Sequence, residues 1–134
     1  MKIDHIAIAV FNLDEGSKRM ENILGSKMIV REKVESEGIE AVIFKVGTTK
    51  IELVCPLSED SVVAKFLRKR GEGLHHIALA VDDMDEEVER LRSKQVTLVG
   101  EDPREGAMGR KVMFIHPKST PGVLLELVET PKGE

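Results

Sequence analysis

One sequence pattern occurs twice in this chain, and this repeat restricts the fold more than any other feature. Residues 4–10 (DHIAIAV) align without a gap with residues 75–81 (HHIALAV). Each copy alternates in the manner of a β-strand, and a stretch rich in Asp or Asn, typical of a helix start, follows it. The repeat predicts two pseudo-symmetric units from one duplicated ancestor.

The two copies continue with the same predicted order of elements: a strand, a helix and three further strands. In the first copy these are residues 3–10, 14–24, 28–34, 39–46 and 50–55; in the second they are residues 75–81, 85–94, 96–101, 110–116 and 122–128. Gly25 is a common type of C-cap and ends the first helix. Residues 47–49 predict a tight turn, and residues 61–70 predict a linker helix.

This order of elements predicts an α+β fold class, with two βαβββ modules in tandem. We expect a single domain over residues 1–134, with module one at 1–55, a linker helix region at 56–73 and module two at 74–129. A chain of 134 residues is long enough to bury a core of its own.

Composition excludes several classes of partner. The formal net charge is −4 and both Trp and Tyr are absent, which argues against nucleic acid, because phosphate binding needs a basic face and base stacking needs aromatic rings. The single cysteine fits a reducing compartment. No apolar run approaches the roughly 18 residues that a membrane span needs. We therefore expect a soluble cytoplasmic protein with no membrane partner.

Four polar residues interrupt strands that are otherwise apolar. His5 and His76 occupy matching positions of the repeat, on a strand face that continues with alanines, so we expect open space in front of each imidazole. Glu52 and Glu126 lie in the last strand of each half, between apolar neighbours. An ionised carboxylate in such surroundings is strongly destabilised unless it is paired or bound to a cation.

Taken singly, each of these residues has a plain structural explanation. A buried histidine is usually hydrogen-bonded within the fold, and a glutamate on a sheet usually faces solvent. The pseudo-twofold relation changes this expectation, because it brings all four side chains toward one axis. Two imidazoles and two carboxylates suit a divalent ion of intermediate softness. The sequence therefore predicts a curved mixed sheet around a metal-binding cleft.

Several longer strings carry a resemblance to a known family. They are residues 4–10, 47–53 (GTTKIEL), 73–78 (GLHHIA), 106–109 (GAMG), 114–118 (FIHPK) and 122–127 (GVLLEL), in this order over nearly the whole chain. In these strings the chain resembles the vicinal oxygen chelate superfamily of glyoxalases, bleomycin resistance proteins and dioxygenases. Within that superfamily it is most similar to the methylmalonyl-CoA epimerases.

The resemblance implies a set of metal ligands. They fall on His5, Glu52, His76 and Glu126. Glu52 takes a position that varies between Gln and Glu in the family. His76 rather than His75 matches the family's ligand, because His76 aligns with His5. We assign no chemistry to His75, which we expect on the helix side or at the strand end, or to His116, which lies at a turn.

The resemblance also implies a separate catalytic glutamate in the segment before the third strand, here residues 34–39 (VESEGI). Glu35 is the first choice and Glu37 the alternative, and both are expected on one face of a strand, where they would otherwise be solvated charges. Residues 106–109 resemble the family's substrate-facing glycine loop, although an ordinary hairpin connection explains them equally well.

The implied activity is the interconversion of (2R)- and (2S)-methylmalonyl-CoA, an isomerase reaction on an acyl-CoA substrate. A divalent ion would assist removal of the C2 proton through an enolate intermediate, with Glu35 (or Glu37) and Glu126 as the two acid–base groups. Co²⁺ is the first choice of ion, and Mn²⁺, Ni²⁺ and Zn²⁺ also suit such a site. The family implies a homodimer.

Three other functions fit the same scaffold. A glyoxalase I-type lyase would act on a glutathione hemithioacetal with a comparable ligand set. An extradiol-type dioxygenase would keep two His and one carboxylate, so Glu52 as a fourth ligand argues against it. A metal-free protein that sequesters a small molecule such as an antibiotic would need none of the four polar ligands.

Overall fold

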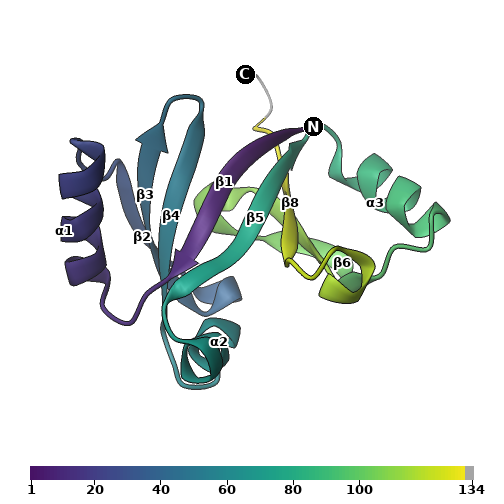
Figure 1. Ribbon diagram of the computed structural model, residues 1–134. Helices are drawn as coiled ribbons and strands as arrows, with labels where there is room; N and C mark the ends of the chain where they lie inside the picture. The colour runs from purple at the N-terminus through teal and green to yellow at the C-terminus, as the bar shows by residue number, and fades with distance from the viewer. Residues whose placement is uncertain (132–134) are drawn as a thin grey trace. The chain divides into compact units, whose positions relative to one another are not determined.

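A computed structural model describes residues 1–131 and divides the chain into two compact units, one of His5–His75 and one of Met1–Asp4 with His76–Glu134. Within residues 1–131 the chain forms three α-helices and eight strands. One α-helix follows the first strand of each unit, and α2 lies between β4 and β5 (Figure 1). In the unit of His5–His75 the strands lie in the order β2-β3-β4-β1, and in the other unit they lie in the order β5-β8-β7-β6. The predicted α+β fold class is confirmed.

The first unit follows the βαβββ order. Its elements are β1 (Lys2–Ala9, which begins in the other unit), α1 (Leu13–Leu24), β2 (Val30–Val34), β3 (Ile39–Val46) and β4 (Thr49–Pro56), followed by α2 (Val62–Arg70). Strand β1 pairs in parallel with β4, and β2, β3 and β4 pair antiparallel in sequence. Helix α1 packs on β3 and β4, and α2 packs on β4. The core between α1 and the sheet contains Val10, Leu13, Val42, Phe44 and Leu53.

The second unit repeats this order. Its elements are β5 (Gly73–Val81, which begins in the other unit), α3 (Met84–Ser93), β6 (Leu98–Glu105), β7 (Lys111–Ile115) and β8 (Leu125–Glu129). Strand β5 pairs in parallel with β8, and β6, β7 and β8 pair antiparallel in sequence. Helix α3 packs on β8 over a core of Val81, Met84, Val88, Leu91, Met113, Ile115 and Leu127.

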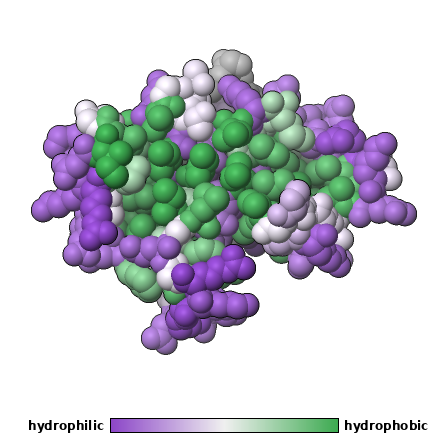
Figure 2. Space-filling view, in the orientation of Figure 1, coloured by the Kyte–Doolittle hydropathy of each residue, from purple (hydrophilic) through white to green (hydrophobic). Residues whose placement is uncertain are grey.

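Helix ends follow local sequence signals. The side chains of Asn12, Ser61 and Asp83 each accept a hydrogen bond from a backbone N–H in the first turn of α1, α2 and α3. Gly25 ends α1 at φ 69°, a left-handed conformation that glycine adopts without strain. The outward faces of α1 and α3 are hydrophilic, whereas apolar side chains gather over the neighbouring strands (Figure 2).

Most predicted elements are confirmed to within two or three residues, and β3 matches its predicted bounds. Strands β6 and β8 begin later than expected. The register of β6 shifts between Val99 and Arg104, so this strand runs on to Glu105. Within residues 1–131, no helix is long and apolar enough to cross a lipid bilayer.

We expect Phe44→Ala to lower the free energy of unfolding by about 3–5 kcal/mol, because it leaves a cavity where a side chain with 0% exposure packs on α1. Phe11→Ala is the matched control, since Phe11 is 63% exposed, and its effect should stay within about 0.5 kcal/mol. Urea denaturation of both variants measures the difference. Equal losses of unfolding free energy in the two variants would show that Phe44 does not pack in the core beneath α1.

Candidate metal centre

In the unit of His5–His75, His5 and Glu52 form a buried pair. Strand β1 lies parallel to β4 with Ala7 opposite Glu52, and His5 precedes Ala7 by two residues, so both side chains lie on one face. Nε2 of His5 is 3.3 Å from Oε2 of Glu52. The two residues are 7% and 4% exposed.

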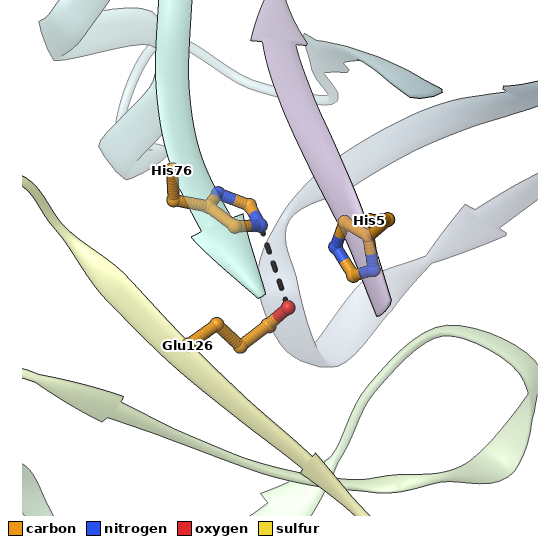
Figure 3. Close-up of side chains that lie close together, drawn as sticks. All are labelled: His5, His76 and Glu126. Carbon is orange, nitrogen blue, oxygen red and sulfur yellow. Dashed lines mark ion pairs between the residues drawn. The ribbon is translucent and has the colours of Figure 1, made fainter. Parts of the chain in front are cut away.

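The other unit builds the same pair from the second copy of the pattern. Strand β5 lies parallel to β8 with Ala78 opposite Glu126, and His76 precedes Ala78 by two residues. Nε2 of His76 is 3.4 Å from Oε1 of Glu126, and the carboxylate points toward the imidazole (Figure 3). These residues are 5% and 6% exposed. The repeat in sequence is therefore a repeat in side-chain geometry.

The distances within each pair suit two ligands of one cation. Charge-assisted hydrogen bonds between N and O are shorter, at roughly 2.7–2.9 Å. Two ligands that each lie about 2.0–2.2 Å from one ion are roughly 3–3.5 Å apart.

The charge of the donor set fits a divalent ion as well. In each unit the donor pair combines one imidazole with one carboxylate, so a bound cation would compensate the negative charge of the carboxylate. Their burial in apolar strands makes such compensation necessary, because an isolated buried carboxylate is strongly disfavoured. Nitrogen and oxygen donors in this ratio are typical of sites for intermediate transition metals. The residues present therefore fit a divalent metal site.

The strand face beyond each histidine differs from expectation. We predicted open space in front of the imidazoles because this face continues with alanines. Ala7, Ala9 and Ala78 are instead 0% exposed, and Ala78 packs against Val112 and Val128. Side chains of neighbouring strands cover the small Ala78, so alanine does not by itself indicate a hollow.

The position predicted for Glu35 and Glu37 is wrong in one respect. They lie in a 3-10 turn, Glu35–Glu37, between β2 and β3 rather than on one face of a strand. Gly38 ends this turn at φ 66°, and its N–H donates to the Glu35 carbonyl. Glu35 is exposed and Glu37 is half-buried. The sequence signal for a turn was Gly38, because glycine after a short polar segment often adopts a left-handed conformation.

The other two histidines have structural surroundings, as predicted. The ring of His75 packs against Phe66 of α2, with ring centroids 5.0 Å apart. Nδ1 of His116 accepts a hydrogen bond from the N–H of Lys118 at the start of a short 3-10 turn.

Phe114 is a neighbour of the site that sequence reasoning missed. Its ring meets the His76 imidazole edge to face at 5.4 Å, and it lies opposite Glu126 in the β7–β8 ladder. Pairing the two predicted strands antiparallel would have located it. Such a contact restricts rotation of the imidazole and keeps one of its sides dry.

Known proteins resemble this chain over most of its length. A family model described as the Glyoxalase/Bleomycin resistance protein/Dioxygenase superfamily matches residues 4–114. The Bacillus subtilis protein YqjC is 43% identical over 133 residues, covering 99% of this chain and 94% of that protein. The human mitochondrial methylmalonyl-CoA epimerase is 38% identical over 127 residues, covering 94% of this chain and 72% of that protein.

Solved structures agree with these relatives. Methylmalonyl-CoA epimerase of Streptomyces coelicolor in complex with 2-nitronate-propionyl-CoA superposes with a TM-score of 0.95 at 36% identity, covering 100% of this chain and 97% of that one. The chain belongs to the Glyoxalase/Bleomycin resistance protein/Dioxygenase superfamily, and within it to the methylmalonyl-CoA epimerase family.

We expect the purified protein to bind one equivalent of Co²⁺, and His76→Ala to weaken this binding. The loss should exceed the roughly 10- to 100-fold that follows removal of an outer-shell partner, because a ligand itself is removed. His116→Ala is the matched control, since it removes an exposed imidazole. Calorimetric titration of the metal-free proteins measures both affinities. Equal affinities in the two variants would place the ion elsewhere.

Cys55 should react slowly with iodoacetamide at neutral pH. Burial raises the pKa of its thiol, and the nearby Glu40 carboxylate raises it further, so the protonated form prevails at pH 7. The alkylation rate should climb only above the ordinary thiol range of about 8.5. The urea-unfolded protein, measured from pH 6 to 10, is the control. If the alkylation rate of the folded protein rises at the same pH as that of the unfolded protein, or at a lower pH, the pKa of the Cys55 thiol is not raised by folding.

Proposed function

We propose that this protein is a methylmalonyl-CoA epimerase, which interconverts the (2R) and (2S) forms of its substrate with the help of a divalent ion. The observation that carries the proposal is the pair of buried imidazole–carboxylate contacts, His5–Glu52 and His76–Glu126, built identically in the two units. The names of the relatives support the substrate, and the bound 2-nitronate-propionyl-CoA of the Streptomyces enzyme supports an acyl-CoA ligand.

In this proposal His5, Glu52, His76 and Glu126 hold the ion. When bound, the ion would act as a Lewis acid on the thioester oxygen, where negative charge develops as the C2 proton leaves. The chain's own task is to keep the four donors fixed and dry, since electrostatic stabilisation is strongest where water is excluded. Phe114 contributes by packing on the His76 ring.

Epimerisation also needs a base on one face of the C2 carbon and an acid on the other. Glu126 is one partner in this proposal, in addition to its role as a residue that would hold the ion. Glu35, or alternatively Glu37, is the other, acting from the 3-10 turn between β2 and β3. Positioned acid–base groups usually contribute about 10²- to 10⁴-fold.

The setting of the enzyme forms part of the same proposal. Co²⁺ is the first choice of ion because the donor set has intermediate softness, and Mn²⁺, Ni²⁺ and Zn²⁺ are the others. We infer one domain over the chain, a homodimer as in the family, and a cytoplasmic location consistent with Cys55 as the single cysteine. No observation favours a glyoxalase I-type lyase, an extradiol-type dioxygenase or a metal-free binding protein.

Wild-type protein loaded with Co²⁺ should catalyse deuterium incorporation at C2 of methylmalonyl-CoA in heavy water, and the metal-free protein should lose nearly all of this activity. Most of the acceleration depends on the ion, because acid–base groups alone supply too little. Proton NMR follows the exchange, with elemental analysis to verify removal. Full activity without metal would refute the proposed role of the ion, and no exchange by the Co²⁺-loaded protein would refute the proposed function.

Substitution separates the two candidate bases. We expect Glu35→Gln to lower kcat by about 10²- to 10⁴-fold while the affinity for Co²⁺ stays unchanged, because a base outside the ligand set is lost. Glu37→Gln is the matched variant, two residues further along the same 3-10 turn. The variant with the larger loss of kcat identifies the base. If both variants keep wild-type kcat, the second base lies outside this turn.

A further inference from the structure

Arg110 joins three segments of the unit that contains His76. Its Nη1 donates to Oδ1 of Asp4 at 2.9 Å, and its Nε donates to the carbonyl of Glu129 at 2.9 Å. The side chains of Arg110 and Asp4 are 11% and 10% exposed, so the ion pair is largely withdrawn from solvent. Asp4 immediately precedes His5 on β1, and Glu129 ends β8, the strand that carries Glu126.

The backbone of Arg110 closes the loop of residues 106–109. Its carbonyl accepts from the N–H of Gly106 at 2.8 Å, and its N–H donates to the carbonyl of Ala107. Within the loop Met108 has φ 58°, which is rare for a residue with a side chain. A Cβ at Gly106 would lie 2.8 Å from Val112, so this position is restricted to glycine.

We propose that Arg110 is a positioning residue for the epimerase site, which fixes the loop of residues 106–109 relative to Asp4 and to β8, the strand that carries Glu126. This inference rests on the proposed function. A buried ion pair is often no more stabilising than an apolar pair of similar volume. A contribution to folding stability alone therefore does not explain the ion pair of Arg110 with Asp4. The planar fork of arginine instead fixes directions, because it holds a carboxylate and a carbonyl with one rigid group.

The test must separate positioning from loss of an ion pair. Arg110→Met alone leaves the Asp4 carboxylate without this partner and can unfold the protein, so the informative variant is D4N/R110M, which removes both charges. Arg110→Lys keeps the positive charge but loses the fork. Arg92→Met is the control, since the exposed Arg92 guanidinium also donates to a backbone carbonyl, that of Glu101.

We expect D4N/R110M and R110K to melt near the wild-type temperature while the amide protons of Gly106 and Arg110 (or its replacement) exchange at least tenfold faster by NMR. With Co²⁺ and methylmalonyl-CoA, kcat should fall about 10- to 100-fold, as small displacements in an active site do, while R92M keeps wild-type values. Wild-type loop exchange in both variants would overturn the proposal. This measurement needs no substrate, so it decides the role of Arg110 even if the wild-type protein fails as an epimerase.

Discussion

Two carboxylates buried in apolar strands are the constraint on which the rest of this structure depends. Glu52 is 4% exposed and Glu126 is 6% exposed, and each occupies a strand whose neighbouring positions are filled by Leu, Ile or Val. Ionised carboxylates are strongly disfavoured in such places unless positive charge compensates them. An imidazole faces each of them, at 3.3 Å in one unit and at 3.4 Å in the other, and a cation bound at such a pair would compensate the carboxylate.

Strand register is what brings each histidine to its glutamate. In both units a parallel pair sets an alanine opposite the glutamate, and the histidine precedes that alanine by two residues. A slip of one residue would turn the imidazole to the other face of the sheet. The packing of Leu53 and Leu127 under α1 and α3 therefore stabilises the site as well as the core, because it fixes the face on which the adjacent glutamate lies.

Sequence reasoning succeeded where periodicity and duplication carried the information. The strand-like composition of residues 39–46 predicted β3 at its observed bounds. Alignment of the repeats matched His76 rather than His75 to His5, and His76 faces Glu126 as His5 faces Glu52. It failed where local chemistry decided the outcome. Glu35 and Glu37 lie in a turn because Gly38 adopts a left-handed conformation, and β6 runs past its predicted end through a shift in register. The contact of Arg110 with Asp4 joins residues 106 positions apart, which no local pattern can indicate.

Crystallographic anomalous diffraction from the Co²⁺-loaded protein tests the proposed centre most directly. The account predicts one strong peak about 2.0–2.3 Å from a donor atom of each of His5, Glu52, His76 and Glu126. A peak coordinated by other side chains, or fully loaded crystals in which the two imidazole–carboxylate pairs bind no ion, would contradict it.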